Sequence, residues 1–436
     1  MIDIRFLREN PDIVKVAARH KNAKVSDHDI DELVRLDEKR RQLLVEVEDL
    51  RRERNELSES LKKGRPSSEQ IEKGRQLKEK LASREDEFKQ VDGEYLRILK
   101  LVPNIPADDV PVGASEDENQ VVKAVGKKPE FDFEPLNHWQ LAERKGWIDK
   151  GRAAKVAGAR FAYLKGGLVR LEFALIQFVT DQLTNEAVLK QIIAGGSKEV
   201  RGVSTRPFVP VLPPYMIRTE MYDAMDRLEP SDDRYKIEGE DLWLQGSAEH
   251  VLGSMHAGEI FEEQDLPLRY LGFTTAFRRE AGTYGKDMEG IIRMHQFDKL
   301  EMESFTTADM SLVEHHFLVA IQEYLLKTLE LPYQVLLKCT ADIGKPNARG
   351  VDMEVWIPGQ GRYMETHTAD YMTDYQTRRL QTRVRRPEGV ELAHTNDATA
   401  LALGRTMVAI LENNQQKDGG VKVPAALVKY YGGETL

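Results

Sequence analysis

The segment from Phe277 to Glu301 concentrates residue types that bind phosphorylated nucleotides. Two alternating, strand-like stretches flank a charged loop that contains glycines, which is the pattern of a strand–loop–strand hairpin. Arg278 and Arg293 supply planar guanidinium groups suited to phosphate or carboxylate, and Phe297 supplies a ring on which a base could stack. The segment is therefore compatible with a nucleotide site, although an ordinary hairpin with surface arginines would account for any one of these residues alone.

A second segment, residues 394–413, places one charged residue inside an apolar run. From Ala400 onward the pattern predicts a buried helix with small residues at its start, and Arg405 is the charge within that run. A buried arginine is costly unless an anionic or aromatic group meets it. We expect Arg405 either to form a structural ion pair or to contact a ligand.

The N-terminal part of the chain predicts a long helical hairpin. Apolar residues recur at heptad spacing in two stretches, which is typical of a coiled coil. Between the stretches, Gly64 and Pro66 would end the first helix, and Ser67 or Ser68 could cap the second. The pattern predicts an antiparallel α-helical coiled-coil hairpin with arms at about 30–63 and 68–102.

Basic side chains gather along one arm of this hairpin and near its turn. They are Arg51, Arg52, Arg54, Lys62, Lys63 and Arg65. Such a group would suit the phosphate backbone of a nucleic acid. A dimerisation coiled coil or a simple spacer would explain the hairpin equally well at this point.

The remainder of the chain has the pattern of a second, mixed domain. Residues 103–135 are rich in proline and acidic residues and read as a linker. Beyond them, helical patterns at 168–183 and 309–329 alternate with short β-rich runs at 208–212 and 353–358. Because these elements follow no strict βαβ rhythm, we expect an α+β domain with a mainly antiparallel sheet.

The composition of the chain bears on its number of domains and on the cellular compartment in which it works. A chain of 436 residues suggests two or more domains, and its formal net charge is −10. The single cysteine, Cys339, allows no intramolecular disulfide and suits a reducing compartment. No stretch has the apolar length of a membrane span or a signal peptide, so neither membrane insertion nor secretion is expected. We find no P-loop and no GxGxxG motif.

Several stretches resemble the signature motifs of one family. Motif 2 of the seryl-tRNA synthetases is similar to FRREAGTYGKDMEGIIRMHQFDKLE, and their motif 3 is similar to ALALGRTMVAILENNQ. The motif 1 strand end of class II synthetases resembles VPVLPPYMI, which contains Pro214. The similarity continues through DMEVWIPGQGRYMET, DYQTRR and RAAKVAGARFAYLKG, and the hairpin resembles the coiled coil with which this family grips its tRNA. The resemblance covers nearly the whole chain.

The resemblance implies a fold and a division into domains. Residues 1–105 would form a tRNA-binding domain with the helical hairpin, and residues 106–135 a linker that leads into the next domain. Residues 136–436 would form a class II catalytic domain of the α+β class, with a mainly antiparallel β-sheet flanked by helices. A homodimer with motif 1 at its interface is implied as well.

The implied activity is that of a cytoplasmic, ATP-dependent aminoacyl-tRNA ligase. It would activate L-serine with ATP and Mg²⁺ to seryl-adenylate and transfer serine to the 3′ end of tRNA(Ser), with tRNA(Sec) as a further candidate acceptor. Neither DNA nor a membrane is an expected partner. Two alternatives remain open: a paralogue that activates another small amino acid or loads serine onto another acceptor, and a catalytically silent RNA-binding relative.

Roles at the nucleotide follow from the resemblance residue by residue. Arg278 and Arg405 would be catalytic, with Arg278 bridging the α-phosphate of ATP and the carboxylate of the amino acid. Glu280 would help to bind the nucleotide, Arg293 would hold the outer phosphates, and adenine would lie between Phe297 and Arg405. The ATP-binding set is completed by Glu365, Thr366, His367 and Thr368. Of these, Glu365 and Thr368 would also hold Mg²⁺.

The resemblance also implies a serine pocket, and it is there that the chain departs from the family pattern. The serine-binding set is Ser247, Glu249, Arg278, Glu301, Asp397 and Thr399, in which Glu301 and Thr399 would meet the serine hydroxyl. His250 follows the Ser-Ala-Glu segment where most of the family has valine, and Asp397 replaces an asparagine. His367 lies in the segment usually written E-I-S-S-C-S-N. These changes would either preserve serine specificity by another route or mark a changed substrate.

Overall fold

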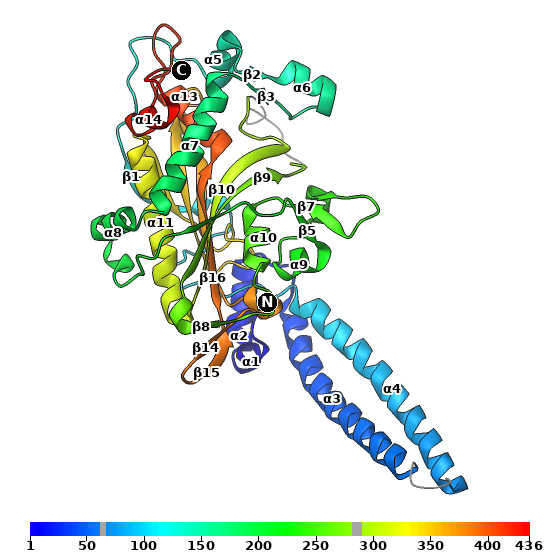
Figure 1. Ribbon diagram of the computed structural model, residues 1–436. Helices are drawn as coiled ribbons and strands as arrows, with labels where there is room; N and C mark the ends of the chain where they lie inside the picture. Colours follow the sequence, from blue (N-terminus) through cyan, green and yellow to red (C-terminus); the bar gives the residue numbers. More distant parts are fainter. Residues whose placement is uncertain (62–66, 281–289) are drawn as a thin grey trace. The chain divides into compact units, whose positions relative to one another are not determined.

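The computed structural model describes residues 1–61, 67–280 and 290–436 (Figure 1). It divides into two compact units, Met1–Ile105 and Pro106–Leu436. Three of the basic residues expected to bind tRNA, Lys62, Lys63 and Arg65, lie outside the described residues. Part of the motif 2-like loop, residues 281–289, does so too.

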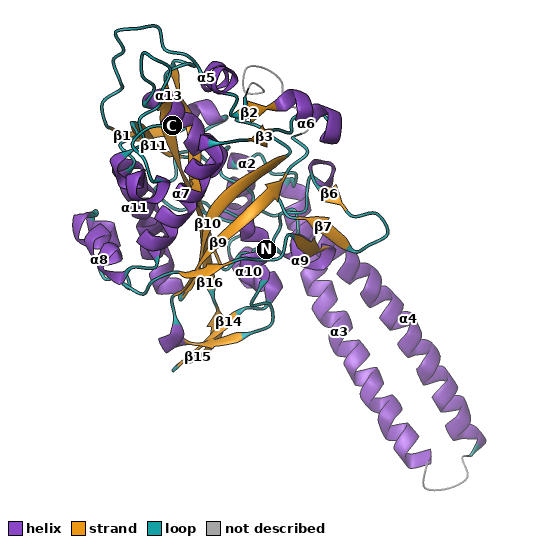
Figure 2. Ribbon diagram, turned by 45° about the horizontal axis from the view of Figure 1, so that its top comes forward, coloured by secondary structure: helices purple, strands orange, loops and turns teal. Residues whose placement is uncertain are grey.

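The smaller unit is a helical hairpin on a small base. Its helices are α1 (Ile4–Glu9), α2 (Pro11–His20), α3 (Asp27–Leu61) and α4 (Ser68–Leu99). Helices α3 and α4 run antiparallel to each other (Figures 1 and 2). Val47 and Leu50 of α3 pack against Leu77 and Leu81 of α4, as the heptad pattern predicts. The predicted coiled-coil hairpin is confirmed.

Two local features stabilise the hairpin: a cap at the start of α4 and an apolar cluster at its base. Ser67 caps α4 through a capping box with Gln70, which satisfies backbone N–H groups at the helix start. At the other end, α1 and α2 cover the base of the hairpin, where Ile30, Leu33 and Ile98 belong to a buried apolar cluster. These contacts hold the two arms together at the base of the hairpin.

The larger unit is built on one broad sheet. Its described residues form eight strands in the order β1-β11-β12-β13-β16-β10-β9-β4, antiparallel except for the β4–β9 pair. The strands are β1 (Gln120–Val125), β11 (Tyr333–Leu337), β12 (Arg349–Ile357), β13 (Arg362–Thr373), β16 (His394–Ala402), β10 (Gln296–Thr306), β9 (Leu268–Phe277) and β4 (Val209–Val211). The prediction of a mainly antiparallel sheet is confirmed. Strand β1 comes from the segment 106–135, which was expected to be a linker and the entry into this domain.

Helices and smaller sheets surround this sheet (Figure 2). The helices are η1 (Glu116–Glu118), α5 (His138–Lys145), α6 (Lys150–Ala157), α7 (Gly167–Leu183), α8 (Glu186–Gly195), η2 (Lys198–Val200), α9 (Thr219–Ala224), η3 (Ser231–Asp233), α10 (Ala248–Ser254), η4 (Glu263–Asp265), η6 (Ala308–Met310), α11 (Ser311–Thr328), α12 (Thr377–Leu380), α13 (Leu403–Asn413), η7 (Ala425–Leu427) and α14 (Val428–Tyr431). The smaller sheets are β15-β14-β8 (Gly389–Leu392, Arg383–Arg386, Ile260–Glu262), β2-β3 (Ile148–Asp149, Tyr163–Leu164) and β5-β7-β6 (Met216–Arg218, Leu242–Leu244, Tyr235–Lys236). No helix in the described ranges is both long and apolar enough to cross a membrane.

The two faces of the central strands have different surroundings. Met302, Ala398 and Ala369 are register partners on β10, β16 and β13, and all three are fully buried in the main hydrophobic core. Helices α7, α11 and α13 contribute to the same core. Because side chains alternate along a strand, the next residue on each of these strands points to the opposite face. That second face carries the candidate site.

One expectation is wrong at the start of the motif 3-like segment. Residues from Ala400 onward were expected to be helical, but Ala400–Ala402 end strand β16 and α13 begins at Leu403. Strand β16 pairs with β13 as far as Ala398 and with β10 as far as Ala402, where Lys299 and Leu300 of β10 oppose Ala402 and Leu401. Pairing with β10 outweighs the helical propensity of alanine and leucine.

A buried ion pair ties the sheet to α11 and supports a stability prediction. Arg269 of β9 is 1% exposed, and it donates to both carboxylate oxygens of Glu314 at 2.6 and 2.7 Å. The same guanidinium donates to the carbonyl oxygens of Ser204 and Arg206. Removing one partner of such a pair leaves a buried charge uncompensated, at a cost of about 3 kcal/mol or more.

We expect Arg269→Met to lower the melting temperature by about 5 °C or more, as measured by differential scanning calorimetry. The exposed pair formed by Arg385 and Glu262 at 3.1 Å provides the matched control. Because exposed pairs contribute little, Arg385→Met should shift the melting temperature by no more than about 1–2 °C. Equal shifts in the two variants would show that the buried pair has no special structural role.

Candidate active site

A cavity of about 340 Å³ lies where the ends of β9 and β10 meet β13, β16, α10 and the start of α13. It brings together most of the residues expected to bind ATP or serine. These are Ser247, Glu249, Arg278, Glu280, Arg293, Phe297, Glu301, Glu365, Thr366, Thr368, Asp397, Thr399 and Arg405. His367 is not among the lining residues, and only 1% of it is exposed.

Arg278 follows directly after β9 and is held at both its backbone and its side chain. Its backbone N–H donates to the carbonyl of His295 at 3.0 Å, which continues the β9–β10 pairing. Its Nε donates to the carbonyl of Gly246 at 3.0 Å, and its guanidinium carbon lies 5.3 Å from the ring centre of Phe297. The guanidinium is thus fixed in the cavity before any ligand arrives.

Glu280 and Arg293 face each other across the motif 2-like hairpin. Arg293 Nη1 donates to Glu280 Oε2 at 3.1 Å. Glu280 has a left-handed backbone (φ 51°), a conformation that costs a non-glycine residue free energy unless its surroundings hold it. Arg160, from the segment before α7, donates to the carbonyl of Glu280 at 2.6 Å and supplies such a contact.

Arg405 makes the ion pair that the sequence left as one of its alternatives. Its Nη1 donates to Glu365 Oε1 at 3.1 Å and to the Glu365 carbonyl at 2.8 Å. Desolvation by the cavity walls opposes ionisation of Glu365, whose side chain is 50% exposed, but the positive charges of Arg405 and Lys338 outweigh it and lower the pKa of this carboxyl group. Both residues line the cavity, so the pair also presents charged groups to a ligand.

The end of the cavity that was expected to bind serine contains a glutamate with two polar neighbours. Ser247 Oγ donates to Glu301 Oε2, and Lys299 Nζ lies 2.7 Å from Glu301 Oε1. Thr399 is the register partner of Glu301 on the neighbouring strand, so both side chains lie on the same face of the sheet. A buried carboxylate beside two hydroxyl groups offers the acceptors and donors that a small hydroxyl ligand requires.

The two unexpected histidines add no positive charge to the pocket. Burial, together with Arg227 and other nearby cations, places the pKa of His250 well below its ordinary value, and Gly246 N–H donates to its Nδ1 at 3.2 Å. Burial lowers the pKa of His367 to about 3, and its Nδ1 lies 2.8 Å from Thr366 Oγ1. Both rings are therefore neutral near pH 7.

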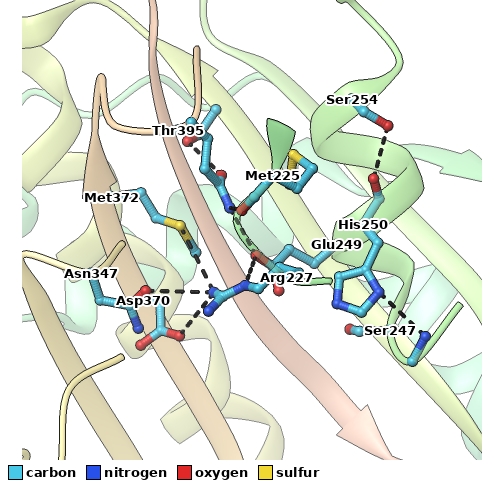
Figure 3. A network of polar contacts seen from close by, with 12 residues as sticks. Met225, Arg227, Ser247, Glu249, His250, Ser254, Asn347, Asp370, Met372 and Thr395 are labelled. Carbon is cyan, nitrogen blue, oxygen red and sulfur yellow. Dashed lines mark hydrogen bonds and ion pairs between the residues drawn. The ribbon is translucent and has the colours of Figure 1, made fainter. Parts of the chain in front are cut away.

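Sequence reasoning did not identify Arg227, Lys299 or Asp370 as lining residues. Figure 3 shows Arg227 reaching toward Glu249 and Asp370. Lys299 and Asp370 lie within the motif-like stretches, where alternation along a strand could have suggested that they face the site. Arg227 follows α9 in a segment without periodic pattern, and no sequence signal marks it.

The chain was compared with known proteins. Residues 1–106 match the family model described as Seryl-tRNA synthetase N-terminal domain, and residues 234–414 match tRNA synthetase class II core domain (G, H, P, S and T). The serine--tRNA ligase of Methanocella arvoryzae is 40% identical to the chain over 441 residues, which cover 99% of each protein. The chain belongs to the seryl-tRNA synthetases.

Solved seryl-tRNA synthetase structures agree with this assignment. The enzyme of Pyrococcus horikoshii, solved with ATP, is similar with a TM-score of 0.87 and 36% identity, covering 100% of this chain and 99% of that one. The cytoplasmic enzyme of Naegleria fowleri, solved with AMP, has a TM-score of 0.83 and 28% identity, covering 100% and 98%. The resemblance to seryl-tRNA synthetases and the class II fold expected from it are confirmed.

Proposed function

We propose that this chain activates L-serine with ATP to seryl-adenylate and transfers the serine to the 3′ end of tRNA(Ser). The observation that carries the proposal is the cavity itself. It joins arginines suited to phosphates with a carboxylate and hydroxyl set suited to a small hydroxyl amino acid. Membership of the seryl-tRNA synthetases supports the same activity.

The chemistry of activation needs no nucleophilic side chain. A carboxylate oxygen of serine attacks the α-phosphorus of ATP in line, the bond from that phosphorus to the bridging oxygen breaks, and pyrophosphate leaves. The fixed guanidinium of Arg278 stabilises the negative charge that grows on the α-phosphoryl oxygens. Orientation of the two substrates in one cavity supplies much of the remaining acceleration.

The other cavity residues have roles in binding. Phe297 and Arg405 would enclose adenine. Arg293 has five N–H donors, so its guanidinium could donate to the outer phosphates while it keeps its hydrogen bond to Glu280. Glu301 and Thr399 would bond the serine hydroxyl, and Glu249 would receive the α-ammonium group. In the second step, a terminal hydroxyl of tRNA attacks the seryl carbonyl carbon, and AMP leaves.

The oxygen-rich side of the cavity fits Mg²⁺. Glu365 and Thr368 supply a carboxylate and a hydroxyl, and Thr368 is the register partner of the buried Asp352. These are hard oxygen donors of the kind that Mg²⁺ prefers. Among the described residues, no group of three or more His, Cys, Asp or Glu side chains is arranged to hold a metal alone. Glu365 and Thr368 would therefore hold the ion together with phosphate oxygens of ATP, where it would neutralise phosphate charge.

The hairpin is the proposed tRNA arm. Arg51 pairs with Glu85 and Arg52 with Asp49, both at 2.7 Å and both largely exposed to solvent. Exposed pairs of this kind are weak, so phosphates can compete for these guanidinium groups and for Arg54. We further propose a cytoplasmic homodimer in which the hairpin of one subunit holds a tRNA that the active site of the other subunit charges.

Amino-acid-dependent ATP–pyrophosphate exchange tests the activity directly. We expect serine to exceed threonine, alanine, glycine and cysteine, and to exceed alanine by about a hundredfold. An analogue without the hydroxyl leaves buried polar groups unsatisfied, at about 1–3 kcal/mol each. Exchange that favours another amino acid would support the paralogue. If no amino acid gives exchange, and ATP binding is absent too, the silent RNA-binding relative would be supported.

A further inference from the structure

Three carboxylates stand side by side on the cavity face of the sheet. Glu303 of β10 is the register partner of Asp397 of β16, and Asp397 is the register partner of Asp370 of β13. Residues directly opposite each other have Cβ atoms about 4.5–5.5 Å apart, and like charges in such positions repel. All three are buried, and Asp370 and Asp397 line the cavity.

A fourth carboxylate, Glu249 of α10, lines the same part of the cavity. Glu249 is 6% exposed, so water screens its charge poorly. Both carboxylate oxygens of Glu303 and Oδ1 of Asp397 have no hydrogen-bond partner among the described residues. Burial and the neighbouring carboxylates raise the pKa values of Glu303, Asp397 and Asp370, and a cation nearby relieves this repulsion.

Arg227 brings positive charge into this group (Figure 3). Its Nε donates to Glu249 Oε1 at 2.7 Å, and its Nη2 lies 3.8 Å from Asp370 Oδ2. The same Nη2 donates to Asn347 Oδ1 at 3.5 Å. The guanidinium thus spans from α10 to β13, and both elements also line the cavity.

The contacts of Glu249 fix which of its oxygens can meet a ligand. Gln376 Nε2 donates to the same Oε1 at 3.0 Å, so both the arginine and the glutamine occupy one oxygen. Gln376 is held in turn by Thr395, whose hydroxyl donates to its Oε1. Both hydrogen bonds fall on Oε1, so Oε2 is the oxygen that we assign to a ligand in the cavity, which Asp397 also lines.

We propose that Arg227 is a positioning residue of the amino-acid subsite. It offsets the charge of Asp370 and holds Glu249 so that Glu249 and Asp397 together receive the α-ammonium group of the substrate. The inference rests on the proposed activation of serine. Arg227 acts through these carboxylates and is not assigned a contact with the reacting atoms.

Steady-state exchange kinetics of Arg227→Gln test the proposal. We expect KM for serine to rise about thirtyfold, KM for ATP to stay within about twofold, and kcat to stay within about threefold. Arg227→Lys retains the charge but loses the planar fork, so its KM for serine should rise only about fivefold. An unchanged KM for serine, or equal rises for serine and ATP, would overturn the proposal.

A double variant separates charge balance from packing. Asp370→Asn removes a carboxylate that has two nearby cations, Lys338 and Arg227, and that loses one of them in Arg227→Gln. KM for serine should therefore be at least about threefold lower in the double variant than in Arg227→Gln alone. If Arg227 acted through packing alone, the second substitution would bring no recovery. Should Arg227→Gln fail to fold, the Lys variant and its combination with Asp370→Asn provide the same comparison.

Arg379 provides a matched control. It is a mostly buried arginine that pairs with Asp223 and does not line the cavity. Arg379→Gln should lower the melting temperature and leave KM for serine within about twofold. The two proposals fail separately: absence of serine-dependent exchange in the unaltered protein would refute the proposed function, whereas normal exchange with an insensitive Arg227→Gln would refute only this inference.

Discussion

Arg278→Ala should lower the rate of serine-dependent ATP–pyrophosphate exchange about a thousandfold. The guanidinium of Arg278 is held by the Gly246 carbonyl and by the Phe297 ring, so its position is set before substrate binds. Removal of one preorganised donor from a developing negative charge typically costs about 10²–10³ in rate. Because the charge develops only in the transition state, the loss should fall mainly on kcat.

Two companion variants sharpen this test. Arg279 is the next residue, is exposed and does not line the cavity, so Arg279→Ala should exchange pyrophosphate at a rate within about twofold of the unaltered protein. Arg278→Lys should remain impaired, because an ammonium group cannot bridge a phosphate and a carboxylate as a planar fork does. Binding of tRNA to Arg278→Ala should change by no more than a few fold. Near-normal adenylate formation in Arg278→Ala would refute the role assigned to this residue.

Shortening the hairpin should abolish aminoacylation while sparing activation. Removal of residues 33–100 would take out the whole hairpin, but Leu33, Tyr95 and Ile98 belong to the core at its base. Replacing residues 45–86 with a short glycine–serine turn keeps that base. The shortened arms would still be joined by the ion pair between Lys39 Nζ and Glu87 Oε1, which lie 2.9 Å apart. We expect kcat/KM for tRNA(Ser) to fall about a thousandfold, with serine-dependent exchange within about twofold.

The physical reason is the loss of phosphate contacts. Each contact between a basic side chain and a phosphate releases counterions, so binding by the intact hairpin should weaken as salt rises. A variant with Arg51, Arg52 and Arg54 all changed to glutamine keeps the helices and should give a shallower salt dependence. Charging of tRNA(Ser) and tRNA(Sec) measured side by side would define the acceptor range. Undiminished charging by the shortened protein would show that the hairpin is not the tRNA arm.

Features that depend on neighbours in sequence were predictable from the chain alone. The heptad spacing of α3 and α4 predicts the coiled-coil hairpin because a helix repeats its face locally. The alternation around Arg278 and Phe297 predicts the β9–β10 hairpin, since a strand also repeats over a few residues. Most of the residues expected at the cavity came instead from the resemblance to the family's motifs, which are themselves local stretches of sequence.

Features that depend on distant partners were decided only by the tertiary structure. Ala400–Ala402 became strand because Leu401 and Ala402 pair with Leu300 and Lys299 of β10, which local propensity does not encode. His250 and His367 depart from the family pattern in the sequence, and only burial in the folded chain makes both rings neutral. Arg227 and Glu249 meet Asp370 only because α10 packs over the sheet, so the charge balance of the pocket arises from contacts between segments far apart in sequence.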